Sequence, residues 1–330
     1  MPIEHSILHF IHKQQGETES KLHLKETELA ASSHIDSLHS RLHEIYHAKA
    51  EKGYGVFAKP AGLFQQLLQQ WQAEELSFVA FSQQSATHFK DILEKEPLAS
   101  GGHLLMSYER RGMSDFVWIV ILHQVHGLAV NEALELSETE YVDLNHLHLA
   151  AKINLTEWQN DSNNDRYISF VKGKTAKKVT EYFKNFIGCE ETVNPVEQTQ
   201  QLVKDFQTFC QGSALNPEKT GEYSEKLYDL CKNQAAEGGV VQVNDIASLF
   251  DTPDMNAFAD NLDQRSIIPH KRSLKQFVQL EGKMGGFSIS FQRKLLGNSV
   301  FFDADTGVLT ITDLPTDLRA QLLEMLGVTA

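Results

Sequence analysis

The sequence predicts an α+β fold in which an antiparallel sheet with inserted helices is followed by a mostly helical domain that ends in a small antiparallel sheet. Three observations favour this fold class. In the first half, strand patterns follow one another closely with helical patterns between them, which is typical of local antiparallel pairing rather than of a doubly wound parallel sheet. Residues 196–262 are mostly helical, polar and acidic. From residue 287 onward the chain returns to short strands separated by turns.

The first predicted elements are a pair of antiparallel strands and a helix. Apolar and polar residues alternate through 6–12 and again through 21–25, with Gly16 between the two segments. Ser32 and Ser33 are candidate N-caps for the helix that follows. Its predicted buried stripe consists of four apolar residues at helical spacing, Ile35, Leu38, Leu42 and Ile45.

Two more helices, over 63–71 and 78–93, lead into the predicted centre of the first domain. A hairpin is predicted there from strands at 103–108 and 116–124, which a glycine-containing turn connects. A third strand at 127–131 would complete an antiparallel meander.

The second domain is predicted to open with a strand over 167–171 and a helix over 175–186, joined by Lys172-Gly173-Lys174. We place its boundary in a stretch crowded with Asn, Asp and Ser, which gives domains of 1–162 and 163–330. The second domain ends in a three-stranded sheet and a closing helix. The strands of that sheet are expected at 287–291, 299–302 and 308–312.

Composition excludes several classes of protein. Of the 330 residues, 41% are hydrophobic and 22% are charged, which argues against disorder and against a fibrous chain. The longest apolar run, 116–122, has seven residues, whereas a membrane-spanning helix needs about 20. The N-terminus lacks the basic and apolar regions of a signal peptide, and the three cysteines form no CxxC pair. We therefore expect a protein of the reducing cytoplasm that does not enter the membrane.

The formal net charge of −14 is unevenly distributed along the chain. Residues 166–188, the first basic stretch, carry six basic side chains and one acidic. Residues 264–294, the second basic stretch, carry seven basic and one acidic. The segment 189–263 between them carries four basic and 14 acidic. Two positive stretches in an acidic chain are compatible with phosphate binding, although such runs are often ordinary solvated surface.

The string His43-Glu44-Ile45-Tyr46-His47 matches HExxH, in which two histidines one helical turn apart bind Zn²⁺ and the glutamate activates a water. His39 lies one turn earlier, so a metal-binding column of histidines is one alternative. The predicted apolar stripe leaves these histidines on its flank, where side chains are normally solvated, and no later helix offers an obvious third ligand. We therefore interpret the string as helix surface and predict no metal, no cofactor and no catalytic residue.

The string Gly173-Lys174-Thr175 lies between a strand and a helix, where a phosphate-binding loop belongs. A Walker A motif needs a further glycine at position 168, which is Ile168, so an ATP site is not predicted. A helix that opens at a glycine among lysines still suits other phosphate oxygens. The candidate contacts of the first basic stretch are Arg166, Lys172, Lys174, Lys177, Lys178 and Lys184.

The second basic stretch supplies three more candidate contacts, Lys271, Arg272 and Lys275. Its phenylalanines, Phe277, Phe287 and Phe291, are predicted to be core residues of strands, so base stacking is not indicated. The glycine-rich region 282–286 is expected to form a flexible loop that lets a backbone approach closely.

Several short blocks spread over the chain match a known family. In the middle of the chain they are Asp143-Leu144-Asn145-His146, Leu155-Thr156-Glu157-Trp158 and the run from Arg166 to Lys174. Near the C-terminus they are Gly285-Gly286, Ile289-Ser290-Phe291, Leu295-Leu296-Gly297, Leu309-Thr310-Ile311 and Leu318-Arg319-Ala320-Gln321-Leu322. With these blocks the chain resembles the bacterial nucleoid-associated protein family NdpA, also called YejK. The resemblance extends from Ile7 almost to the C-terminus and implies a cytoplasmic protein that accumulates on the nucleoid, binds DNA and has no established catalytic activity.

Two functional hypotheses follow. The first is a non-enzymatic protein of the nucleoid that contacts backbone phosphates of double-stranded DNA, without sequence preference, through the two basic stretches. The alternative is an adaptor whose acidic segment 189–263 docks onto other nucleoid or DNA-handling proteins. A zinc hydrolase based on HExxH is a third and less favoured reading.

Overall fold

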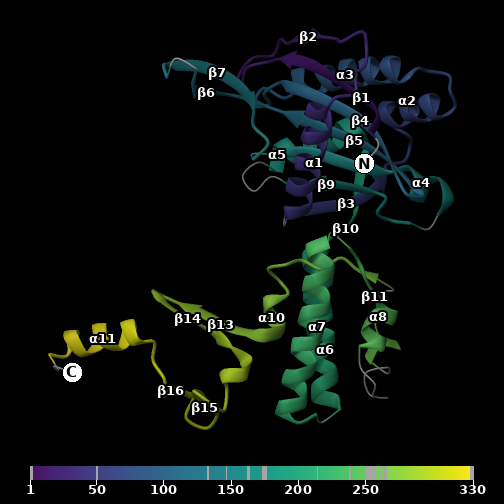
Figure 1. Ribbon diagram of the computed structural model, residues 1–330. Coiled ribbons are helices and arrows are strands. Elements are labelled where there is room, and N and C mark those ends of the chain that lie inside the picture. Colours follow the sequence, from purple (N-terminus) through teal and green to yellow (C-terminus); the bar gives the residue numbers. More distant parts are fainter. Residues whose placement is uncertain are drawn as a thin grey trace. The chain divides into compact units, whose positions relative to one another are not determined.

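The computed structural model describes residues 3–327 except 50, 132–133, 146, 162–163, 173–176, 214, 238, 250–257, 261 and 263–265. The chain divides into two compact units, residues 1–195 (unit 1) and residues 196–330 (unit 2), both drawn in Figure 1. In the described part of the chain, no helix has the length and apolar character required to cross a membrane.

Unit 1 is built on an antiparallel sheet of eight strands in the order β10-β3-β9-β8-β5-β4-β1-β2. The strands are β1 (Ile3–His12), β2 (Lys21–His23), β3 (Lys52–Phe57), β4 (Gly102–Arg111), β5 (Ser114–Leu122), β8 (Leu149–Asn154), β9 (Ile168–Val171) and β10 (Cys189–Val193). The helices are α1 (Ser33–Ala48), α2 (Leu63–Gln72), α3 (Phe78–Glu94), α4 (Leu155–Asn160) and α5 (Lys177–Ile187). This arrangement confirms the predicted α+β class.

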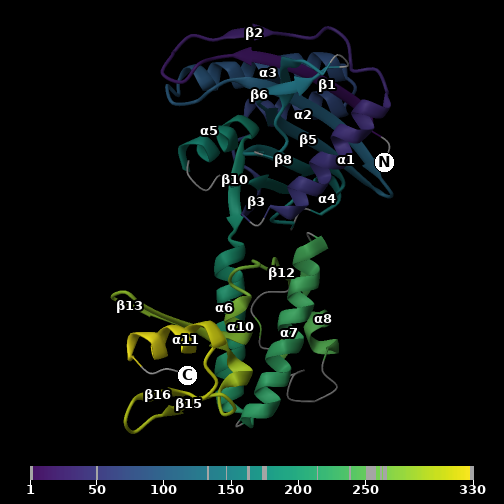
Figure 2. The same cartoon turned by 60° about the vertical axis from the view of Figure 1, so that its left-hand side comes forward.

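The central strands are buried on both faces, which explains the apolar run in β5. Leu104 and Ile119 belong to a core with residues of α2, α3 and α5. Their neighbours Leu105 and Trp118 point to the other face, where they pack with residues of α1. Figure 2 shows α1 lying across one face of the sheet. Because successive side chains of a strand alternate between faces, a strand covered on both sides has to be apolar throughout.

Most predicted elements of unit 1 are confirmed. β1 pairs with β2, β4 pairs with β5, and the Ser32 side chain caps α1 by accepting a hydrogen bond from the Ile35 amide at 3.4 Å. The predicted third strand of the meander is wrong. It corresponds to β6 (Gln124–Val130), which pairs with β7 (Leu136–Val142) in a separate two-stranded ribbon. The position beside β5 is taken by β8 instead.

Unit 1 extends beyond the boundary placed at residues 162 and 163. β9 pairs with both β3 and β8, and β10 pairs with β3 at the edge of the sheet. The helix between them, α5, buries Phe183 and Phe186 in the core beside α2 and α3. These elements complete the sheet and its cover, so the chain leaves unit 1 at Pro195.

Unit 2 begins with two long helices, α6 (Pro195–Gly212) and α7 (Pro217–Glu237). They share a core with the short helices α8 (Val243–Ser248) and α10 (Lys275–Val278), in which Phe206, Leu227 and Phe277 are buried. Unit 2 also contains a small two-stranded ribbon, formed by β11 (Val241–Gln242) and β12 (Ser266–Ile267).

The C-terminal part of unit 2 consists of two hairpins and a helix, and it differs from the predicted three-stranded sheet. β13 (Gln279–Met284) pairs with β14 (Phe287–Gln292), and β15 (Val300–Asp303) pairs with β16 (Val308–Ile311). A short 3-10 helix, η1 (Arg293–Leu295), lies between the hairpins, and α11 (Thr316–Met325) closes the chain (Figure 1). The strand at 287–291 thus pairs with an unpredicted neighbour, β13, rather than with β15.

Two local predictions in the first hairpin are also wrong. Gly285 and Gly286 form a two-residue turn with φ of 39° and 84°, the sign that a tight hairpin turn requires, rather than a flexible loop. Phe277 is buried but lies on the helix α10, and Phe287 on β14 is 60% exposed, so neither is a core residue of a strand.

Candidate nucleic-acid interface

Two lysines of the first basic stretch are paired with carboxylates. Lys172, which follows β9, donates a hydrogen bond to Glu191 on β10. Lys184 on α5 has its Nζ 3.2 Å from Glu181 Oε1 and 3.8 Å from Glu191 Oε2, and its side chain is only 14% exposed. Glu191 lies outside the stretch in sequence but beside it in the sheet. Lys172 and Lys184 are therefore poorly placed to contact phosphate.

The other candidates of this stretch are only partly described. Arg166 is half-buried, and its backbone amide donates to Asn164 Oδ1 at 2.9 Å. Lys174 lies outside the described residues. Lys177 and Lys178 open α5, but the description covers their backbone and not their side chains.

The second basic stretch is held on a firmly anchored turn. The His270 amide donates to Thr199 Oγ1 on α6 at 2.8 Å, and His270 Nδ1 lies 2.9 Å from Ser273 Oγ. Leu274 and Phe277 are buried in the core of unit 2. Ser273 is buried against His270, whereas the cationic side chains lie at the surface: Arg272 and Lys275 are exposed and Lys271 is half-buried. A rigid backbone thus presents all three candidate cations of this stretch.

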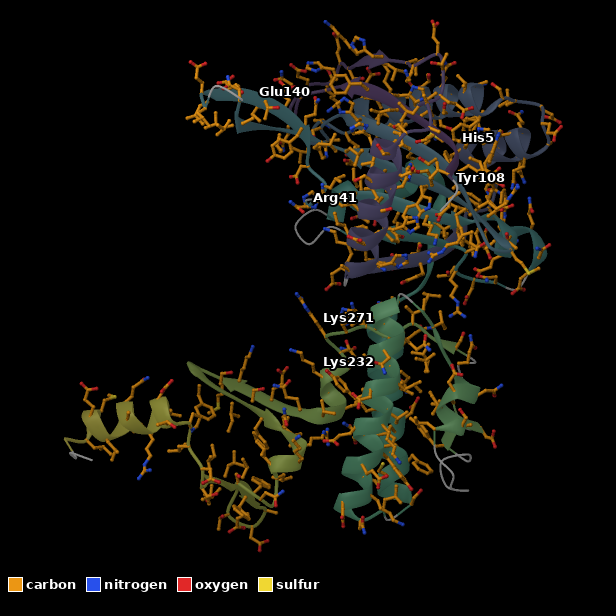
Figure 3. The ribbon with its side chains drawn as sticks, in the orientation of Figure 1. His5, Arg41, Tyr108, Glu140, Lys232 and Lys271 are labelled. Atoms are coloured by element: carbon orange, nitrogen blue, oxygen red, sulfur yellow. The ribbon has the colours of Figure 1, made fainter. Side chains whose placement is uncertain are left out.

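In the described part of the second stretch, the lysines lack the carboxylate partners that Lys172 and Lys184 have. Among the described residues, no carboxylate lies within 4.0 Å of the ammonium groups of Lys271, Lys275, Lys283 or Lys294. In the view of Figure 3, Lys232 of α7 and Lys271 project from the same side of unit 2. Lys232 is exposed, and sequence reasoning missed it because it lies in the acidic segment. Only the packing of α10 against α7 associates it with the second basic stretch.

Arg293, also in this stretch, faces inward and is a weaker phosphate candidate. It lines a cavity of about 480 Å³ between α6, α7 and α10, together with Phe206, Cys210 and Gln276. Burial lowers the pKa of its guanidinium, while Cys210 opposes that change.

The side of α1 that carries the HExxH histidines was predicted to be solvated, but it is largely buried. α1 is rotated so that His39, Leu42, His43 and Tyr46 face the sheet, whereas Glu44 is exposed. The prediction that His39 and His43 are surface residues is therefore wrong. Histidines can belong to the buried face of α1 because polar side chains on the strands that the helix covers contact them.

His43 meets a buried carboxylate. Its Nε2 lies 3.0 Å from Glu109 Oε2, and Trp118 Nε1 donates to the same oxygen at 2.8 Å. Burial alone would raise the pKa of Glu109, but the hydrogen bonds from His43 and Trp118 lower it to about 2. Lys152 Nζ lies 3.8 Å from the Phe116 ring centroid, and burial lowers its pKa to about 8. The glutamate that His43 meets is thus Glu109, whereas a zincin would use Glu44.

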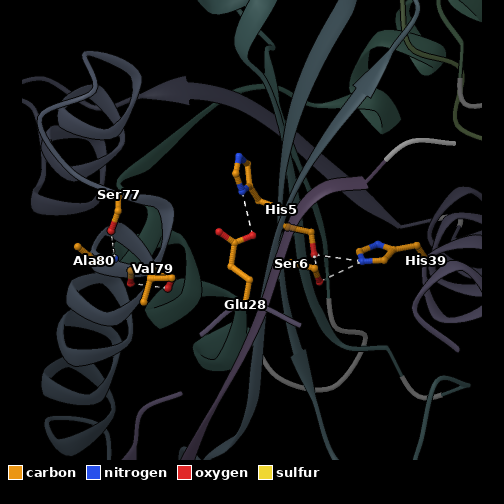
Figure 4. A network of polar contacts seen from close by, with 9 residues as sticks. His5, Ser6, Glu28, His39, Ser77, Val79 and Ala80 are labelled. Atoms are coloured by element: carbon orange, nitrogen blue, oxygen red, sulfur yellow. Dashed lines mark hydrogen bonds and ion pairs between the residues drawn. The ribbon is translucent and has the colours of Figure 1, made fainter. Parts of the chain in front are cut away.

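Within the described ranges, no three His, Cys, Asp or Glu side chains are arranged to hold a metal ion. The rings of His43 and His47 are stacked with centroids 6.0 Å apart. His39 turns away from them, with its Nε2 3.4 Å from Ser6 Oγ and 3.2 Å from Ser107 Oγ, as Figure 4 shows for Ser6. The three histidines therefore form separate contacts rather than one column of ligands.

Burial disfavours the charged form of two histidines, His9 and His39. His9 Nδ1 accepts the Lys25 amide at 3.2 Å, and His9 Nε2 lies 3.0 Å from the Ser82 hydroxyl, which itself donates to the Val79 carbonyl. A proton on His9 Nδ1 would face the N–H of Lys25 and remove this hydrogen bond. Burial lowers the pKa of both His9 and His39 to about 4.

We expect the free energy of unfolding to fall as the pH drops from about 6.5 toward 4. In the unfolded chain these histidines take up a proton near pH 6.5, whereas in the folded chain they do so only near pH 4. Lowering the pH therefore favours the unfolded state. His9 and His39 should each contribute about 2 kcal/mol of loss between pH 7 and pH 5. Urea unfolding across this range tests the effect. His9→Gln should flatten the profile, and the exposed His34→Gln on α1 should leave it unchanged. A profile that is flat in the unmodified protein contradicts the assignment.

Comparison with known proteins gives a consistent result. A family model described as NA37, nucleoid-associated protein YejK, matches residues 7–319. A nucleoid-associated protein of Metapseudomonas resinovorans is 38% identical, with 98% of this chain and 99% of that protein covered. Nucleoid-associated proteins of Pseudomonas putida strain W619 and Pseudomonas entomophila strain L48 are also 38% identical, with 98% of each chain covered.

Proposed function

The chain belongs to the YejK family of nucleoid-associated proteins, and from this premise we propose that it binds the phosphate backbone of double-stranded DNA without sequence preference and catalyses no reaction. It would do so on the nucleoid, in the bacterial cytoplasm. The observation that carries the proposal is the second basic stretch, whose lysines are displayed on an anchored turn without neighbouring carboxylates.

The stretch has the chemistry that backbone contact requires. Lysine and arginine displace the counterions condensed on DNA, and this release supplies most of the free energy of nonspecific binding. Base readout depends on hydrogen bonds to base edges in the grooves, whereas a lysine ammonium acts on phosphate as a point charge that carries no sequence information. The acidic remainder of the protein would repel DNA and restrict it to the basic side.

The test is salt-dependent binding of the purified full-length protein to unrelated DNA duplexes of equal length. The logarithm of the affinity should fall linearly with the logarithm of salt concentration, with a slope of about −3.6 to −5.4 for four to six phosphate contacts. Duplexes of different sequence should give the same slope and similar affinity. Binding that does not depend on salt, or no binding at all, would contradict the proposal.

An adaptor function remains the second candidate, because α7 carries an acidic stripe. Glu218, Glu222, Glu225 and Asp229 are all exposed, and their spacing places them on one side of the helix. Such a stripe suits a basic protein surface. An adaptor would associate with DNA only when a partner is present, so the binding experiment with purified protein separates the two functions.

A further inference from the structure

The cavity of about 480 Å³ in unit 2 has a single charged group in its wall. Among the described residues that line it, only Arg293 of η1 carries a charge. The Nε atom of Arg293 is buried and has no hydrogen-bond partner in the described part of the chain. A buried polar atom without a partner costs free energy, and buried charges in proteins are normally paired. The guanidinium therefore has a donor free for a ligand.

The surrounding fold does not neutralise this guanidinium. Within the described ranges, no carboxylate oxygen lies within 4.0 Å of its nitrogens. The thiol of Cys210, which also lines the cavity, interacts with it electrostatically. Burial raises the pKa of Cys210 above its ordinary value, so the thiol is uncharged at pH 7 and cannot replace a carboxylate. The positive charge of Arg293 is thus available to an anion.

The rest of the wall suits an organic molecule. Phe206 and Phe277 are each 2% exposed, with ring centroids 5.8 Å apart, and Leu215 adds a third apolar side chain. The Ser224 hydroxyl donates to the Thr220 carbonyl at 2.7 Å, so its oxygen remains free to accept a hydrogen bond. Apolar walls with a few polar groups are typical of small-molecule sites, and the volume lies in their usual range of about 300–1,000 Å³.

We propose that this cavity binds a small organic monocarboxylate, with the carboxylate on the Arg293 guanidinium and the apolar body against Phe206, Phe277 and Leu215. The planar guanidinium matches a carboxylate with two parallel hydrogen bonds. No carboxylate among the described lining residues would repel the anion. An inorganic anion, in contrast, would leave the apolar walls without contacts.

The charge balance favours a carboxylate over a phosphate ester. One guanidinium offsets one negative charge, whereas a phosphate monoester carries close to two at pH 7. The second charge would be buried without a partner, because the described wall offers no other cation. The site is also separate from the proposed DNA contacts, since Arg293 faces the cavity while Lys271, Arg272 and Lys275 lie at the surface.

The first experiment is calorimetric titration of the full-length protein, without DNA, using indole-3-acetate as the probe. We expect one site with a dissociation constant on the order of 0.1 mM. Indole-3-acetamide has the same shape but no charge, and it should bind at least about tenfold more weakly. Acetate, which lacks the ring, and adenosine monophosphate, which carries the second charge, should both bind more weakly than indole-3-acetate.

Substitutions in η1 test the role of the guanidinium. Arg293→Gln should weaken binding of indole-3-acetate at least about tenfold, and Arg293→Lys should have an intermediate effect because it keeps the charge but loses the fork. The matched control is Lys294→Gln, which removes the same charge from the exposed neighbouring residue and should leave binding unchanged. Arg293→Gln should not lower the midpoint of thermal unfolding, since the buried charge that it removes has no partner.

Protection of Cys210 from alkylation tests the location of the site in the unmodified protein. Cys210 lines the cavity, whereas Cys231 is buried in the same unit but does not line it. At a probe concentration ten times the dissociation constant, iodoacetamide should modify Cys210 about tenfold more slowly, with a smaller change at Cys231.

Four outcomes would each overturn the proposal: no binding of indole-3-acetate at 10 mM, equal or tighter binding of the amide or of adenosine monophosphate, unchanged affinity in Arg293→Gln, and equal slowing at both cysteines. None of these measurements involves DNA, so the result is independent of the proposed function.

Discussion

Replacing Lys271, Arg272 and Lys275 together by glutamine should weaken DNA binding roughly a hundredfold at about 0.15 M salt and flatten the salt slope by up to about 2.7. Each lost phosphate contact removes about 0.9 from the slope, and the three losses add if all three side chains touch the backbone. The weakening should be equal for unrelated sequences. Fluorescence anisotropy over a salt series measures both quantities.

Two controls make this result specific. Lys21, Lys59 and Lys95 are exposed lysines of unit 1, and changing all three to glutamine removes the same charge elsewhere. Changing Lys172 and Lys184 instead should have little effect, because Glu191 and Glu181 already pair with them. If either control weakens binding as much as the triple variant does, the second basic stretch is ordinary solvated surface and the assignment is wrong.

Replacing His43 by alanine should destabilise the protein by about 3 to 5 kcal/mol. The change leaves the fully buried Glu109 carboxylate with Trp118 as its remaining hydrogen-bond donor. Urea unfolding at pH 7 measures the loss. A zinc-binding surface helix, in contrast, would lose metal with little change in the stability of the metal-free protein.

The matched control is His34→Ala on the exposed side of the same helix, which should change the stability by less than about 0.5 kcal/mol. A second variant, His43→Leu with Glu109→Leu, should recover much of the loss, since two buried polar partners can often be replaced together by apolar residues of similar shape. Equal effects of His43→Ala and His34→Ala would show that the contact with Glu109 contributes nothing.

Local sequence patterns were sufficient where neighbouring residues decide the structure. The alternation in 6–12 and 21–25, the Ser32 cap and the apolar run of β5 all depend on contacts close along the chain or on a simple burial period. The buried face of α1 was predicted only in part. Leu42 is buried and Leu38 and Ile45 pack against the core, as their apolar spacing indicated. The buried side chains also include His39 and His43, because Ser6, Ser107 and Glu109 on distant strands contact them.

The candidate nucleic-acid interface shows the same difference between what the local sequence determines and what the fold determines. The sequence by itself determined that the protein is α+β, that two stretches are basic, and that the chain resembles a nucleoid-associated family. Only the tertiary structure decided that Glu191 pairs with lysines of the first stretch and that the second stretch is anchored through His270. It also decided that, among the described residues, the lysines of the second stretch have no carboxylate nearby and that α11 buries none of its side chains. The physical reason is that charge sums and periodicity are properties of neighbours in sequence. Ion pairing and burial instead depend on which distant strands and helices the fold brings together.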